Sequence, residues 1–117
     1  MITKKGCNFE SEYHEGRLYL LLKGEIDHHS AVAVRSAIDQ KLYELRPFSL
    51  VMDLSKIEFM DSSGLGLIMG RYALMQKLGG DFIIANPSDR VRKIFELAGL
   101  GRIIKIEELN RNKEVAR

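Results

Sequence analysis

The pattern of hydrophobic and polar positions changes period along the chain, and each change predicts an element. Apolar and polar side chains alternate weakly over residues 7–14, and a run of apolar residues, 18–22, follows a turn near His14-Glu15-Gly16. Two such segments with a short connection predict an antiparallel β-hairpin. Over residues 27–45 apolar side chains recur at spacings of three and four, which is typical of a helix with one buried face.

The rest of the chain alternates between short apolar runs and helical segments. Apolar runs at residues 48–54, 82–85 and 103–106 predict three further strands, and helical spacing predicts helices that begin near residues 62 and 88. The order β-β-α-β-α-β-α-β predicts an α/β fold, with helices packed against a mixed sheet of about four to five strands and with parallel crossovers. The charged tail after Glu107 is expected to form at most a weak C-terminal helix.

The most informative stretch is residues 59–72, because Asp61, Ser62 and Ser63 fall where a strand passes into a helix. The first backbone N–H groups of a helix have no partner within it, and the helix dipole favours negative charge there. A hydroxyl in that position can help to bind an anion, act as a nucleophile or accept a phosphate. The local sequence leaves these three uses open.

The helix that follows Ser63 has two apolar stripes, more than a helix with one buried face requires. Gly66 and Gly70 lie between the stripes, and each costs about 1 kcal/mol in a helix relative to alanine. Two explanations account for them. The helix packs closely on its sheet, or the glycines form a smooth strip that the backbone of another protein approaches.

Composition favours a small cytoplasmic protein without nucleic-acid or membrane partners. The 117 residues correspond in length to one domain, residues 1–117. The 18 basic and 16 acidic side chains are interleaved, and a formal net charge of +2 is too small for a nucleic-acid surface. The chain starts without the apolar stretch of a signal peptide, and no apolar run approaches the ~20 residues of a membrane span.

Catalytic and cofactor-binding alternatives find weaker support. Ser62 or Ser63 could act as a nucleophile with a neighbouring histidine as base. The G-x-S-x-G pattern of a nucleophile elbow is missing, because Met60 stands where its first glycine would be. The glycines that follow are spaced G-x-G-x-x-x-G instead of the dinucleotide-binding G-x-G-x-x-G, and no P-loop sequence occurs. The three histidines lack a spaced set of carboxylates, so no metal and no cofactor is expected.

A regulatory serine fits this site better than catalytic turnover does. Phosphorylation adds about −1.5 to −2 charges and three acceptor oxygens. The start of a helix can hold that phosphate without a change of fold. The same charge, beside apolar interface surface and Asp61, repels a partner that accepts the neutral form. The local chemistry therefore favours a switch in binding.

Four segments carry a resemblance to a known family. They are residues 24–29 with Asp-His-His, 59–66 with Asp-Ser-Ser-Gly, 67–72 with Gly-Arg-Tyr, and 94–100. With these segments the chain resembles the STAS-domain anti-sigma factor antagonists. The Asp-His-His and Gly-Arg-Tyr segments resemble the sporulation type, which opposes the anti-sigma factor of the forespore sigma factor.

The resemblance implies a STAS fold and a partner-switching protein that is not itself an enzyme. In such a protein the unphosphorylated form binds an anti-sigma factor, which is also a serine kinase, and displaces the sigma factor held there. The kinase then uses ATP to phosphorylate the first serine of Asp-Ser-Ser-Gly, here Ser62, and a serine phosphatase removes the phosphate.

The resemblance and the local chemistry together give the expected functional residues. Ser62 is the expected phosphate acceptor, and the residues expected to support the phosphate are Asp61, Ser63 and Gly64. The residues expected to contact the partner are Asp27, His28, Gly66, Gly70 and Arg71. A STAS module of a stress-response partner-switching pathway is the alternative, followed by a small serine hydrolase or a nucleotide-binding protein.

Overall fold

The computed structural model describes residues 6–109, which form five strands, three α-helices and one short 3-10 helix. In chain order the elements are β1 (Cys7–His14), β2 (Arg17–Ile26), α1 (His28–Leu45), β3 (Ser49–Met60), α2 (Ser62–Leu78), β4 (Asp81–Ala85), α3 (Asp89–Leu97), the 3-10 helix η1 (Leu100–Arg102) and β5 (Lys105–Glu107). The predicted order of strands and helices is confirmed. The expected C-terminal helix falls largely on residues 110–117, outside the described residues.

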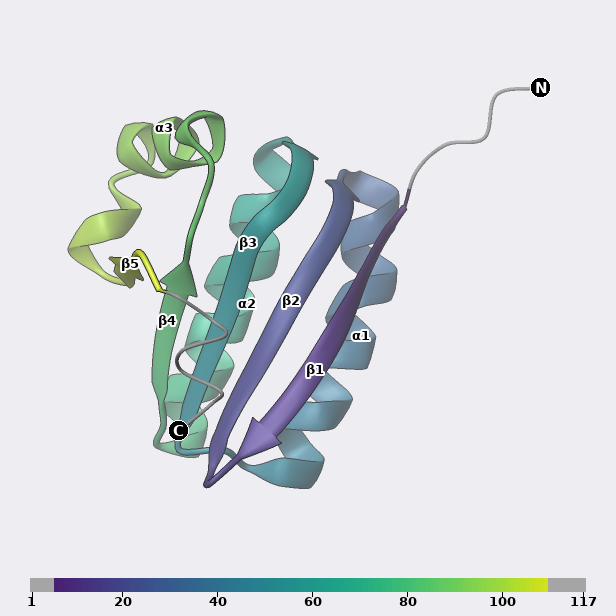
Figure 1. Ribbon diagram of the computed structural model, residues 1–117, viewed down its shortest axis with the longest axis vertical. Helices are drawn as coiled ribbons and strands as arrows, with labels where there is room; N and C mark the ends of the chain where they lie inside the picture. Colours follow the sequence, from purple (N-terminus) through teal and green to yellow (C-terminus); the bar gives the residue numbers. More distant parts are fainter. Residues whose placement is uncertain (1–5, 110–117) are drawn as a thin grey trace.

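The five strands form one sheet in chain order, and α1 and α2 cover one of its faces (Figure 1). β1 and β2 are antiparallel, as the hairpin pattern predicted, whereas β3, β4 and β5 each run parallel to the preceding strand. A parallel neighbour requires a crossover, and the helices supply it by returning the chain to the start of the next strand. The predicted mixed α/β sheet is therefore confirmed.

Alternate side chains of the central strands fill the space between the sheet and the two helices. On β2 and β3 the inward-facing residues are fully buried: Leu18, Leu20, Leu22, Leu50, Met52 and Leu54. They pack in one cluster with Val34, Ile38 and Leu42 of α1 and with Ile68 and Met75 of α2. The strand period of two and the helix spacing of three and four thus meet in the main core.

Two of the strand boundaries that differ from the prediction have an identifiable cause. β3 runs to Met60, past the predicted end at Leu54, because residues 56–60 pair with the second half of β2. Backbone pairing with a neighbouring strand here outweighs the polarity of the exposed side chains. The last strand starts at Lys105, later than predicted, because η1 turns the chain just before it.

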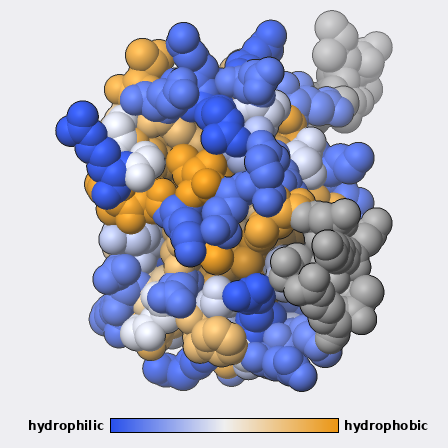
Figure 2. Space-filling model, turned by 60° about the vertical axis from the view of Figure 1, so that its left-hand side comes forward, coloured by the Kyte–Doolittle hydropathy of each residue, from blue (hydrophilic) through white to orange (hydrophobic). Residues whose placement is uncertain are grey.

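The side of the molecule that carries α3 and β5 shows apolar surface enclosed by polar side chains (Figure 2). Leu97 and Ile103, on either side of η1, are 81% and 51% exposed. Phe95 of α3 is fully buried, so this helix is anchored through one face.

The described helices include none that is long and apolar enough to cross a bilayer.

One ion pair ties α1 to α2 beneath their outer surface. Arg71 Nε lies 2.8 Å from Asp39 Oδ1, and the two side chains are 7% and 29% exposed. The contact is ionic without hydrogen-bond alignment, and within the described chain Arg71 Nη1 is also buried with no hydrogen-bond partner. Burial lowers the pKa of Arg71, Asp39 opposes this effect, and the charge of Arg35 adds to it. A guanidinium stays charged in proteins, so Arg71 needs a counter-ion when it is buried. Asp39 supplies that counter-ion.

Replacing Asp39 tests how much the fold depends on this pair. Asp39→Ala should lower the free energy of unfolding by about 1–3 kcal/mol, because a buried guanidinium loses its counter-ion while its partly exposed surroundings limit the loss. The double variant Asp39→Ala/Arg71→Met also removes the buried charge and should recover most of the stability. Urea unfolding followed by circular dichroism measures both, and a double variant less stable than Asp39→Ala would contradict this role for the pair.

Candidate functional site

Ser62 is the first residue of α2 and is exposed. Asp61 precedes it in an extended conformation and caps the helix, because its Oδ1 accepts a hydrogen bond from the Ser63 N–H at 2.8 Å. The Asp61 carbonyl accepts another from the Gly64 N–H at 2.9 Å. Within residues 6–109 no hydrogen bond uses the Ser62 hydroxyl, so the fold leaves it available.

A second helix begins beside this corner, because β2 and β3 are parallel and Ile26 pairs with Met60 (Figure 1). The residues that follow, Asp27 and Asp61, each cap a helix. The Asp61 N–H donates to the Ile26 carbonyl at 3.2 Å and ties the two strand ends together. Two segments that are far apart in the sequence therefore meet at one end of the sheet.

Asp27 holds the start of α1 in a capping box. Its Oδ1 accepts a hydrogen bond from the Ser30 N–H and its own N–H donates to Ser30 Oγ, both at 2.9 Å. Ser30 Oγ also donates to the Glu25 carbonyl at 2.8 Å. His28, the first residue of the helix, is exposed. Of these two predicted partner residues, Asp27 thus has a structural task as well, whereas His28 is open to solvent.

A groove of about 280 Å³ lies between the N-terminal halves of α1 and α2. Its lining comes from both helices: His28, Ala31, Val32 and Arg35 of α1, and Ser63, Gly66 and Leu67 of α2. The structure therefore brings together His28, Ser63 and Gly66 from the predicted site. Val32 and Arg35 were not predicted, although residues one and two turns beyond His28 lie on the same helix face and would have indicated them.

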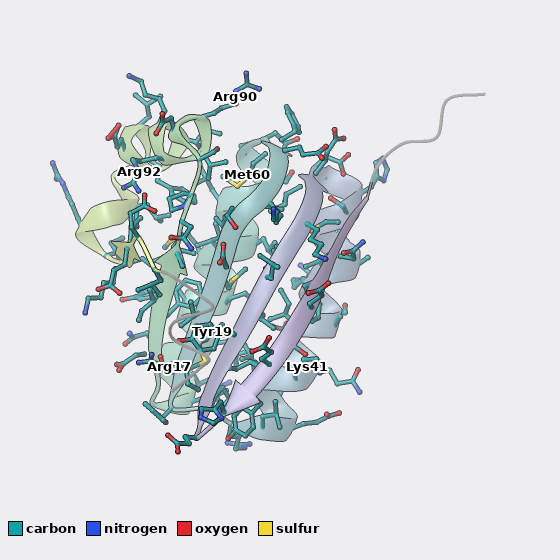
Figure 3. The ribbon with its side chains drawn as sticks, viewed as in Figure 1. Arg17, Tyr19, Lys41, Met60, Arg90 and Arg92 are labelled. Carbon is teal, nitrogen blue, oxygen red and sulfur yellow. The ribbon has the colours of Figure 1, made fainter. Side chains whose placement is uncertain are left out.

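The glycines of α2 differ in their surroundings. A side chain at Gly64 would collide with Cγ and Sδ of Met60, a buried residue at the end of β3 (Figure 3). At Gly66 and Gly70 an added Cβ would meet nothing within 4 Å. Close packing on the sheet is therefore the wrong explanation for Gly66 and Gly70. The glycine that packs tightly is Gly64.

The structure contradicts the predicted partner-facing role of Arg71. This side chain lies between α1 and α2 in its ion pair with Asp39 and is buried. It follows Leu67 by one helical turn and so belongs to the side of α2 that faces α1. Arg71 joins the two helices and is not part of the exposed surface.

The site lacks the arrangement that a serine hydrolase needs. Among residues 6–109, no hydrogen bond joins Ser62 or Ser63 to a histidine, and no three metal-ligating side chains come together. His28 and His29 instead contact each other edge to face, with ring centroids 5.8 Å apart. Because a nucleophilic serine needs a base within hydrogen-bond reach, the arrangement favours binding over covalent catalysis.

Comparison with known proteins identifies the family. The STAS domain family matches residues 8–112 of this chain. An anti-sigma F factor antagonist of Paenibacillus polymyxa is 37% identical over 97 residues, which cover 83% of this chain and 83% of the relative. This chain belongs to the STAS-domain anti-sigma factor antagonists. An anti-sigma-B factor antagonist of Bacillus subtilis is also similar, at 33% identity over 101 residues, 85% of this chain and 89% of the relative.

Solved structures in the family share the fold along nearly the whole chain. The anti-sigma factor antagonist SpoIIAA in its unphosphorylated form is 29% identical, with a TM-score of 0.79 over 92% of this chain and 93% of that chain. The phosphorylated form of SpoIIAA from Bacillus is also 29% identical, with a TM-score of 0.74 over 94% of this chain and 98% of that chain. The predicted STAS fold is therefore confirmed.

Alanine substitutions at the glycines of α2 should change stability in opposite directions. Gly66→Ala and Gly70→Ala should each raise the free energy of unfolding by about 0.5–1 kcal/mol, because alanine favours a helix and finds free space at both positions. Gly64→Ala should lower it by about 1–3 kcal/mol, because the buried Met60 must move. Urea unfolding measures all three, and a loss of stability at Gly66 equal to that at Gly64 would contradict the open surroundings of Gly66.

Proposed function

We propose that this chain is a phosphorylation-switched antagonist of an anti-sigma factor. Its unphosphorylated form binds an anti-sigma factor that is also a serine kinase, and so frees the sigma factor held there. Phosphorylation of Ser62 by that kinase with ATP ends the binding, and a serine phosphatase restores it. This exchange takes place in the cytoplasm, and the chain itself catalyses no reaction. The exposed Ser62 at the start of α2, beside a groove between two helices, is the observation that carries the proposal.

Ser62 is better placed than Ser63 to accept the phosphate. Ser62 is exposed, whereas Ser63 is half-buried and lines the groove. A kinase must align the hydroxyl with the γ-phosphate of ATP, which favours the side chain that stands clear of the surface. The Ser63 N–H is held by the Asp61 cap. In this proposal Asp61, Ser63 and Gly64 shape the start of the helix, and Ser62 reacts.

A phosphate on Ser62 would change the surface charge without unfolding α2. The start of a helix stabilises an exposed negative charge by about 0.3–1 kcal/mol. The added charge of about −1.5 to −2 is therefore tolerated there. Together with Asp61 they would make the end of the groove strongly negative. The two forms of SpoIIAA support this mechanism, since both share the fold of this chain, with TM-scores of 0.79 and 0.74.

The proposed partner surface comprises Asp27, His28, Gly66 and Gly70. His28 and Gly66 line the groove from opposite helices. The open space above Gly66 and Gly70 allows a partner's backbone to approach α2 closely. The carboxylate of Asp27 also caps α1, so its charge is best tested with asparagine, which keeps the cap.

A stress-response antagonist is the second candidate, because an anti-sigma-B factor antagonist is similar at 33% identity over 101 residues. The anti-sigma F factor antagonist of Paenibacillus polymyxa is similar at 37% identity, which favours the sporulation type. Neighbouring genes separate the two candidates. A sporulation antagonist should lie beside genes for a kinase-type anti-sigma factor and its sigma factor.

Incubation with ATP and a kinase-type anti-sigma factor from the same genome should place one phosphate on Ser62. Intact-mass and peptide mass spectrometry measure the number and the position of the phosphates. Ser63→Ala is the matched control and should still be labelled, whereas Ser62→Ala should not. Phosphate found on Ser63 alone would contradict the assignment.

Ser62→Asp should weaken binding to the same anti-sigma factor by about tenfold or more, because it places a carboxylate where the phosphate would lie. The midpoint of thermal unfolding should stay within about 3 °C of the wild type, since a helix N-terminus accepts negative charge. Isothermal titration calorimetry gives the affinity, and Ser62→Ala, which should bind as the wild type does, is the control. Equal affinity of Ser62→Asp and Ser62→Ala would rule out charge repulsion as the switch.

A further inference from the structure

The groove between α1 and α2 carries a positive charge that the described chain does not neutralise. Arg35 is charged, and no acidic residue lines the groove. Arg35 is exposed and, within residues 6–109, makes no ion pair or hydrogen bond. The carboxylate one turn further along α1, Asp39, is already in contact with Arg71 at 2.8 Å.

The neighbouring guanidinium of Arg71 adds to this positive potential. The charge of Arg35 reaches Arg71, whose pKa is lowered by burial and then further by Arg35, against the effect of Asp39. The partial charge of about +0.5 at the N-terminus of α2 is offset by the Asp61 carboxylate that caps this helix. Arg35 and Arg71 share the carboxylate of Asp39, so within the described chain Arg35 remains the positive charge of the groove.

The size and lining of the groove restrict what it can hold. Its volume of about 280 Å³ lies at the lower end of the roughly 300–1,000 Å³ usual for small-molecule pockets and is large enough to admit a side chain from another protein. Ala31, Val32 and Leu67 offer apolar contact, and Gly66 leaves the opening unobstructed. A short side chain with an anionic end matches both the apolar wall and the guanidinium.

We propose that this groove binds a carboxylate side chain, Asp or Glu, of the anti-sigma factor, and that Arg35 is the residue that recognises it. The inference rests on the proposed function and names the chemistry of the partner's contact. A guanidinium offers two parallel N–H donors that match a carboxylate, and such pairs are the stronger hydrogen bonds. With the partner bound, the apolar residues beside Arg35 would limit access of water, which strengthens the pair.

The same contact accounts for release of the partner. Ser62 is adjacent in sequence to Ser63, which lines the groove. A phosphate there cancels the surplus positive charge and repels the incoming carboxylate, so the phosphate and the partner compete for one electrostatic site. Reversal of the charge at Arg35 should therefore imitate phosphorylation.

Titration of variants against the same anti-sigma factor tests the proposal. Arg35→Glu should weaken binding by about tenfold or more, and Arg35→Lys by roughly threefold, because lysine keeps the charge but lacks the paired donors. Lys41→Glu is the matched control, since it makes the same charge change on α1 but outside the groove (Figure 3). Its affinity should stay within about twofold of the wild type, as a charge away from the contact affects binding little. Thermal unfolding confirms that each variant is folded.

Charge exchange identifies the partner's carboxylate. Each exposed Asp and Glu of the anti-sigma factor is replaced by Lys in turn and titrated against Arg35→Glu, and one replacement should restore binding by about tenfold or more. Equal affinity of Arg35→Glu and Lys41→Glu would overturn this inference and leave the proposed function standing, since the wild type would still bind. Loss of binding without any restoring exchange would overturn the carboxylate as the ligand. Failure of the wild type to bind would overturn the proposed function and this inference together.

Discussion

The parallel pairing of β2 with β3 is the constraint on which the site depends. Because Ile26 pairs with Met60, both strands end at the same level and both pass directly into a capped helix. Two helix N-termini are therefore held side by side, with the groove between their first turns. Neither motif forms a surface by itself, since Asp-His-His supplies one wall and Asp-Ser-Ser-Gly the other. The polar half of β3, which extends past the apolar run, provides the length that this alignment requires.

The chemistry at this end of the sheet is electrostatic. Carboxylates occupy the capping positions, where their oxygen atoms accept backbone N–H groups and fix the helix starts. A hydroxyl stands free at Ser62, and a guanidinium stands unpaired at Arg35 within the described chain. Such an arrangement can change its affinity for a charged partner by gaining one modification, and it needs no general base. In the proposed function, such a site is modified by another protein, and the modification changes the affinity for the partner.

The sequence was sufficient where a local pattern determines structure. The β-hairpin, the helix α1 and the start of α2 near residue 62 all follow from periodicity and turn chemistry within a few residues. The position of Ser62 at the start of a helix was predictable for the same reason.

The features that sequence did not give depend on distant neighbours. The second half of β3 is a strand only because β2 lies beside it. Arg71 was expected to contact the partner because it belongs to the Gly-Arg-Tyr segment of the resemblance, and only the position of α1 shows that this side chain is covered. In the sequence, Arg35 looks like an ordinary solvated charge. Only the structure shows that it lines a groove, because α2 forms the opposite wall.

The contact between Gly64 and Met60 bears on how fast the proposed switch can act. The last side chain of β3 is buried directly against the first turn of α2, so the corner that presents Ser62 is fixed to the sheet. In the proposed switch, no segment would have to reorganise when a phosphate is added to Ser62 or removed from it. The speed of the response is then set by phosphoryl transfer, by hydrolysis and by departure of the partner, and slow conformational steps on the scale of local unfolding add no delay. The proposed switch would then depend only on whether Ser62 carries a phosphate. The phosphorylated state would last as long as the kinase outpaces the phosphatase.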